Sequence, residues 1–116
     1  MQSGRRPKRV ANLIKEALGP ILLREFQGGG SGLITVTRVE MTADLQTARV
    51  YLSFFGGLSE EEVLKLIEQR TGYLRKCIAS EIKLKYNPHL IFVRDPAPEY
   101  ERRLDRLMEH LKDEDK

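Results

Sequence analysis

The chain has 116 residues, of which 41% are hydrophobic and 32% charged, with a formal net charge of +3. This length fits one domain around one core, and the composition is that of a folded chain. No apolar run approaches the roughly 18 residues that span a bilayer, and no apolar stretch of a secretory signal follows the basic start. A single cysteine, Cys77, excludes an internal disulfide. We therefore expect a cytoplasmic protein.

Charge is unevenly distributed along the chain. Residues 99–116 carry seven acidic and five basic residues, a net charge of −2, which leaves +5 on residues 1–98. A basic body with a mixed tail is typical of a moderate RNA or DNA binder. An ordinary solvated surface with a small excess of lysine and arginine is the alternative.

The first predicted element is a long helix. Residues 1–5 are expected to form a flexible N-terminus, and a helical stripe of apolar residues follows from Arg6 to Phe26. Proline inside a helix costs roughly 3 kcal/mol, so Pro20 predicts either a kink or a restart. Because the stripe keeps its phase through Ile21, we predict one kinked, continuous helix. The glycine-rich residues 27–32 match no phosphate-binding motif and are predicted to be a connector.

Two strands, at residues 33–41 and 47–55, are predicted to form an antiparallel hairpin. In the first, the apolar alternation slips between Val36 and Val39, which indicates a bulge or a twist. A third strand is predicted at residues 89–93. Its nearly continuous apolar run is typical of a strand that is well covered in a sheet.

The most informative segment is residues 59–84, which reads as one amphipathic helix interrupted at Thr71-Gly72. Ser59 and Glu62 form a capping box at its start. Acidic residues precede the interruption and basic residues follow it, so a kink here gathers cations that could hold a polyanion. Asn87-Pro88 is predicted to end the second half of the helix.

The element order is helix, strand, strand, helix, kink, helix, strand. It predicts an α+β fold with a three-stranded sheet covered by helices on one face. Residues 6–95 are expected to form this domain, and residues 96–116 a C-terminal helical tail. Whether the tail docks on the body or remains mobile is left open.

Catalysis has little support in the sequence. His89 and His110 lack the spacing of a zinc site, and no nucleophile or metalloprotease motif occurs. The acidic cluster at residues 60–62 is explained by the dipole of the helix that it opens. We therefore expect no enzyme activity, no cofactor and no small-molecule substrate.

Two basic clusters are the candidate functional site. Lysine and arginine bind backbone phosphates through counterion release, largely without reading sequence. Aromatic support is weak, since Tyr73 and Tyr86 only flank the second half-helix. The candidate RNA-binding residues are Arg5, Arg6, Lys8, Arg9 and Lys15 in the first cluster, and Arg70, Thr71, Gly72, Arg75, Lys76, Lys83 and Lys85 in the second.

Several fragments, in order and with matching spacing over residues 6–95, resemble the bacterial ribosome-binding factor A family. They are the Arg-Val-Ala-x-x-Ile-x-x-x-Leu pattern of residues 9–18, Ile-Thr-Val-Thr-Arg-Val at 34–39, Asp-Leu-x-x-Ala-x-Val-Tyr-Leu-Ser at 44–53, Thr-Gly-Tyr-Leu-Arg at 71–75 and Pro-His-Leu-Ile-Phe at 88–92. The resemblance implies a single type II KH-like domain that binds small-subunit ribosomal RNA and the small ribosomal subunit as a monomer. It also implies a role in late subunit assembly and in cold adaptation.

Ordinary KH domains clamp nucleic acid with a Gly-x-x-Gly loop, whereas this family has an Ala-x-Gly kink. Here Arg70-Thr71-Gly72 takes that place, so the glycine is kept and arginine replaces alanine. We expect the bend to persist and the added charge to strengthen phosphate contact. Two other functions remain open from the residues alone: a general single-stranded RNA-binding module without ribosomal specificity, and a protein-interaction domain whose cations are incidental.

Overall fold

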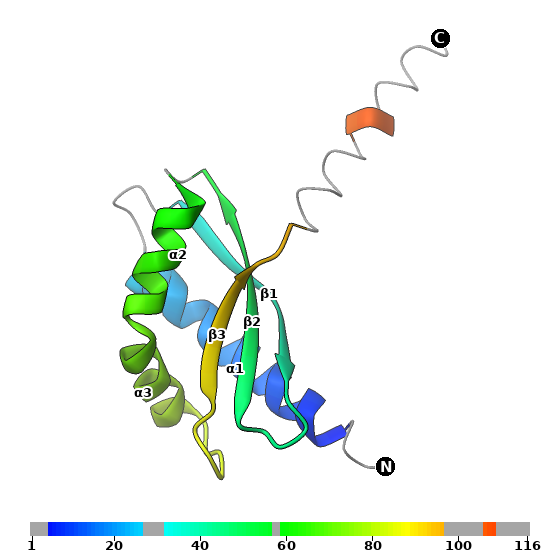
Figure 1. Ribbon diagram of the computed structural model, residues 1–116, viewed down its shortest axis with the longest axis vertical. Helices are drawn as coiled ribbons and strands as arrows, with labels where there is room; N and C mark the ends of the chain where they lie inside the picture. The colour runs from blue at the N-terminus through cyan, green and yellow to red at the C-terminus, as the bar shows by residue number, and fades with distance from the viewer. Residues whose placement is uncertain (1–4, 27–31, 57–58, 97–105, 109–116) are drawn as a thin grey trace.

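Two layers, one of strands and one of helices, make up the structure (Figure 1). It is a computed structural model that describes residues 5–26, 32–56, 59–96 and 106–108. In chain order the elements are α1 (Arg5–Glu25), β1 (Leu33–Met41), β2 (Thr47–Phe55), α2 (Glu60–Gln69), α3 (Thr71–Glu81) and β3 (His89–Arg94). This order confirms the predicted α+β fold.

The sheet has the strand order β1-β2-β3, with β1 and β2 antiparallel and β3 parallel to β2. Its register shifts between Val36 and Arg38, which confirms the predicted bulge in β1. The hydroxyl of Thr37, the residue in this bulge, donates a hydrogen bond of 2.7 Å to the Asp95 carboxylate. Asp95 is buried, so this bond fastens the end of β3 to the opposite edge of the sheet.

The core lies between one face of the sheet and the helices. α1 passes behind the sheet in Figure 1, and it is continuous through Pro20, as predicted. Burial of the apolar stripe on both sides of the proline offsets the hydrogen bond that proline cannot donate. Among the fully buried apolar side chains are Ile14, Leu18, Ile21 and Leu22 of α1, Ala48, Val50 and Leu52 of β2, and Ile67, Leu74 and Ile78 of α2 and α3.

The interruption between α2 and α3 lies at Arg70, one residue before the predicted Thr71-Gly72. The N–H of Arg70 donates to the carbonyl of Ile67, and its own carbonyl accepts from Leu74, so this residue ends one helix and begins the next. Gly72 lies in the first turn of α3, and its φ angle is not positive. The bend therefore does not depend on glycine. The predicted cap of α2 is confirmed, because the Ser59 hydroxyl accepts from the N–H of Glu62.

α3 ends earlier than predicted. Its last residue is Glu81, and Ile82 is already extended, with φ −130° and ψ 141°. Residues 82–88 therefore form a loop rather than a continuation of the helix to Asn87. Ile82 and Leu84 pack against the core from this loop, and burial of both side chains favours the extended path.

The prediction that the third strand is well covered is wrong. Among the described strands β3 lies at the edge of the sheet and pairs with β2 alone, and its burial alternates. Leu90 and Phe92 are buried, whereas Ile91 is 48% exposed. The reason is that the helices cover a single face of the sheet, so every second side chain of β3 faces away from the core.

The predicted boundaries are only partly covered by the structure. α1 begins at Arg5, one residue before the predicted start, and residues 1–4 lie outside the described residues. Of the predicted tail, Arg106, Leu107 and Met108 are helical and exposed, and most of the remainder lies outside as well. Within the part of the chain that the structure describes, no helix is both long enough and apolar enough to cross a membrane.

Candidate nucleic-acid interface

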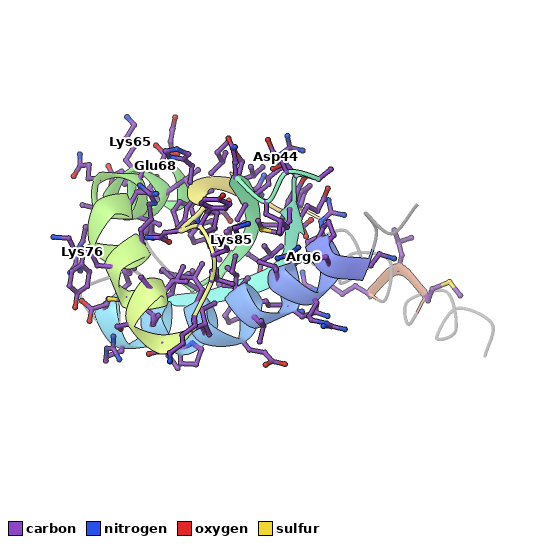
Figure 2. All side chains as sticks on the ribbon, turned by 90° about the horizontal axis from the view of Figure 1, so that it is seen from below. Arg6, Asp44, Lys65, Glu68, Lys76 and Lys85 are labelled. Carbon is purple, nitrogen blue, oxygen red and sulfur yellow. The ribbon has the colours of Figure 1, made fainter. Side chains whose placement is uncertain are left out.

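Three segments that are distant in sequence meet at one end of the molecule. They are the first turns of α1, the β1–β2 turn at residues 42–46, and the α3–β3 loop at residues 82–88. Together they line a groove of about 770 Å³. Figure 2 shows Arg6, Asp44 and Lys85, one from each segment, at this end. We call this feature the basic groove.

The basic groove combines a cationic rim with an apolar floor. Its rim carries Arg6, Arg9, Lys83 and Lys85 against one acid, Asp44. Its apolar lining includes Val10, Leu13, Leu45, Leu84 and Tyr86. An arrangement of this kind suits a ligand that is anionic along one side and flat and apolar along the other.

Local structure places each rim cation. Arg6 and Arg9 are one helical turn apart on α1, on the same side as the floor residues of that helix. Lys83 and Lys85 alternate with Leu84, whose side chain packs inward. This alternation, typical of extended backbone, leaves both lysines exposed.

Arg75 holds the loop that carries these lysines. Its Nε donates to the Pro88 carbonyl at 2.9 Å and its Nη2 to the Asn87 carbonyl at 2.8 Å. The side-chain amide of Asn87 donates back to the Arg75 carbonyl at 3.3 Å. Arg75 is therefore half-buried, and hydrogen bonds within the protein engage its guanidinium group.

The β1–β2 turn that forms the opposite wall is fixed by Asp44. Its Oδ1 accepts hydrogen bonds from the Thr42 hydroxyl at 2.6 Å and from the N–H of Gln46 at 3.1 Å. These two bonds hold the pKa of the Asp44 carboxyl below its usual value, the Thr42 bond having the larger effect. Asp44 is thus ionised at neutral pH, and the rim cations outnumber it.

The second predicted cluster, at the α2–α3 break, is arranged differently. Arg70 Nη2 donates to Glu25 Oε1 at 2.9 Å, and the guanidinium carbon lies 4.9 Å from the centre of the Tyr73 ring. Hydrogen bonds from Arg24, and then from Arg70, hold the pKa of the Glu25 carboxyl below its usual value. The charge of Arg70 is therefore compensated within the protein, which opposes the expectation that it strengthens phosphate contact.

None of the other predicted residues whose side chains are described lines the basic groove. Lys8, Lys15 and Lys76 are exposed, and Lys15 lies in a different groove, beside β1. The Thr71 hydroxyl donates to the Glu68 carbonyl at 2.7 Å, and Gly72 is exposed. Arg5 begins α1, and its side chain is outside the described part. The structure brings together Arg6, Arg9, Lys83 and Lys85 and separates them from the α2–α3 break.

Sequence reasoning did not place the groove's apolar lining or Tyr86 in the site. A signal was present in Lys83-Leu84-Lys85-Tyr86, where alternation before Asn87-Pro88 indicates extended backbone. The apolar lining residues from α1 and the β1–β2 turn gave no such signal, because they reach the groove only through the tertiary fold. Among the described residues, no group of three or more His, Cys, Asp or Glu could hold a metal ion.

The element order and sheet arrangement define a type II KH-like domain, in which α2 and α3 meet at Arg70 without a Gly-x-x-Gly loop. The family model for ribosome-binding factor A matches residues 6–108 of this sequence. The chain belongs to the ribosome-binding factor A family.

Relatives and solved structures agree with this assignment. The chain is 35% identical over 111 residues to ribosome-binding factor A of Halothermothrix orenii, covering 95% of this chain and 91% of that protein. The crystal structure of ribosome-binding factor A from Thermus thermophilus superposes with a TM-score of 0.67 at 22% identity, covering 76% of this chain and 94% of the other. A homology model of the Thermus thermophilus factor, fitted into a cryo-EM map of a 30S complex, gives a TM-score of 0.66 at 23% identity and covers 74% and 91%.

Proposed function

We propose that this protein is a maturation factor that binds free or precursor small ribosomal subunits through small-subunit ribosomal RNA. The observation that carries the proposal is that a member of the ribosome-binding factor A family presents Arg6, Arg9, Lys83 and Lys85 around one groove. The relative from Thermus thermophilus, fitted into a map of a 30S complex, supports the choice of partner.

The proposed contact is electrostatic in its main part. Exposed lysine and arginine side chains displace counterions from the RNA backbone, and this release makes the affinity fall steeply with salt. Lys8 and Lys15, exposed elsewhere on α1, extend the cationic surface beyond the groove. Arg70 and Arg75 contribute through the fold, because hydrogen bonds within the protein engage both guanidinium groups.

The proposal includes no catalytic step. The protein binds the subunit as a monomer. A cytoplasmic location follows from the proposed partner, since small subunits mature there.

Cosedimentation with purified small subunits, large subunits and whole ribosomes tests the proposal. We expect the full chain to sediment with free small subunits, and less with whole ribosomes or large subunits. Binding should weaken as salt rises, with a slope that reflects the number of phosphate contacts. Equal binding to every ribosomal particle and to unrelated single-stranded RNA would instead favour a general RNA-binding module. Failure to bind small subunits at low salt would exclude the proposal.

A further inference from the structure

We infer that the basic groove takes one unpaired nucleotide of single-stranded RNA, with its base against Tyr86 and the apolar floor and its flanking phosphates on the cationic rim. The inference deepens the proposed function and rests on it for the source of the RNA. It specifies the form of RNA that the groove can accept, which charge alone does not.

The size and lining of the groove fit a nucleotide. Its volume of about 770 Å³ lies within the range of sites that bind small ligands. Leu13 and Tyr86 are 39% and 59% exposed, so apolar surface remains uncovered between the cations. A flat, apolar base covers such a surface, whereas a phosphate or a sugar alone does not.

Tyr86 and Lys85 give this nucleotide two adjacent contacts. The Lys85 ammonium lies over one face of the Tyr86 ring, 5.5 Å from its centre. A base that stacks on the opposite face, or that displaces this flexible side chain, brings its own phosphate within reach of Lys85. Every base offers a π-face, so this contact favours unpaired RNA without selecting a sequence.

The opposite rim supplies the next phosphate contacts. Arg6 and Arg9 project from α1 across the groove from the α3–β3 loop, as the positions of Arg6 and Lys85 in Figure 2 show. A strand that passes through the groove meets cations on both sides of its inserted base. A duplex keeps its bases stacked inside, so it can reach the rim but cannot cover the floor.

An acidic peptide is the alternative occupant, and charge alone does not separate it from RNA, because the ionised Asp44 repels carboxylates and phosphates alike. A peptide offers its acidic groups at scattered positions, whereas an RNA strand repeats one phosphate per nucleotide beside each base. The combination of rim and stacking ring therefore favours RNA.

The test compares Tyr86→Ala, Tyr86→Phe and Tyr73→Ala in the full chain. Tyr73 is the matched control, because it is also exposed but lies at the α2–α3 break. Fluorescence anisotropy measures binding to a labelled single strand of about six nucleotides and to a duplex of the same length. The melting temperature of each variant shows whether the fold is kept.

We expect Tyr86→Ala to bind the single strand about ten-fold more weakly than the parent. This loss is within the range found when alanine replaces an aromatic side chain that stacks on one base. Tyr86→Phe keeps the ring and should bind within about two-fold of the parent, as should Tyr73→Ala. Binding to the duplex should be weaker from the start and should not respond to Tyr86. Unchanged single-strand binding by a folded Tyr86→Ala overturns the inference, and so does equal loss for single strand and duplex.

Sedimentation of the parent protein with small subunits separates this inference from the proposed function. If the parent binds small subunits and Tyr86→Ala binds single strands normally, the inference fails while the function stands. If the parent does not bind small subunits, but Tyr86→Ala binds single-stranded RNA more weakly than the parent does, the proposed function fails. The inference that the groove binds an unpaired nucleotide is then still supported. A lower melting temperature of Tyr86→Ala with unchanged RNA binding would make the groove a packing surface and would also overturn the inference.

Discussion

Arg75 and Asn87 hold each other by two hydrogen bonds, one from the guanidinium to the Asn87 carbonyl and one from the Asn87 amide to the Arg75 carbonyl. A third bond, from Arg75 to the Pro88 carbonyl, completes the link between α3 and the start of β3. The loop between them carries Lys83, Lys85 and Tyr86. Arg75, which the sequence predicts to bind RNA, thus holds in place the loop whose side chains are proposed to bind RNA.

Replacing Arg75 by alanine should therefore destabilise the fold. The loss of charge-assisted hydrogen bonds to two carbonyls is expected to cost about 1–3 kcal/mol, measured by chemical denaturation. Arg75→Lys should recover only part of this, because an ammonium cannot reproduce the guanidinium fork. Lys76→Ala is the matched control, since Lys76 is exposed, and it should unfold like the parent. Equal stability of Arg75→Ala and Lys76→Ala would contradict the anchor role.

Gly72→Ala should be tolerated or stabilising. Gly72 lies in the first turn of α3, and an added Cβ would meet nothing within 4 Å. Alanine is the better helix former, so the free energy of unfolding should rise by up to about 1 kcal/mol, measured by chemical denaturation. A bend that required glycine would instead lose both stability and RNA binding. A clear loss of stability in Gly72→Ala would therefore place the bend at the glycine.

The pair formed by Glu25 and Arg70 should couple the end of α1 to the α2–α3 break. Glu25→Ala and Arg70→Ala are each expected to lower the melting temperature. The fall in melting temperature of the double variant should be smaller than the sum of the two single falls, because each single change already removes the shared contact. Strict additivity in this cycle would mean that the contact contributes nothing to stability.

Acid should weaken the fold partly through Glu25. The folded-state pKa of this carboxyl lies below its ordinary value of 4.5. The corresponding stabilisation is therefore present above that value and is lost as pH falls through the lower, folded pKa. Glu25→Gln should give a flatter curve of unfolding free energy against pH on the acid side of 4.5. A curve that parallels the parent over this range would show that Glu25 keeps its ordinary pKa in the folded protein.

Local patterns were sufficient for much of the fold. The stripe through Pro20, an irregularity between Val36 and Val39, and the cap at Ser59 are set by neighbours in sequence, and each was predicted; the structure places the bulge between Val36 and Arg38. The end of α3 was not predicted, because Leu84 also fits helical spacing. Its extended position depends on packing against the core and on the bonds of Arg75, which join residues far apart in sequence.

The candidate site shows the same division. Its cations are visible as residue types, but sequence does not distinguish a free arginine from an engaged one. Arg70 meets Glu25 only because α1 and the α2–α3 break pack together. Arg6 and Lys83 meet at one groove for the same reason, since the fold joins the first turn of α1 to a loop late in the chain.

The most direct test of the account is quantitative sedimentation with small subunits of two double variants, Lys83→Gln/Lys85→Gln and Lys65→Gln/Lys76→Gln. Both remove two exposed positive charges, one pair from the basic groove and the other from α2 and α3 (Figure 2). We expect the groove pair to lose about ten-fold in affinity and its salt slope to become shallower by about 1.4, corresponding to two phosphate contacts. The affinity of Lys65→Gln/Lys76→Gln for small subunits should fall by less than about three-fold. Equal losses, or a larger loss for the α2–α3 pair, would contradict the claim that the basic groove is the principal contact with ribosomal RNA.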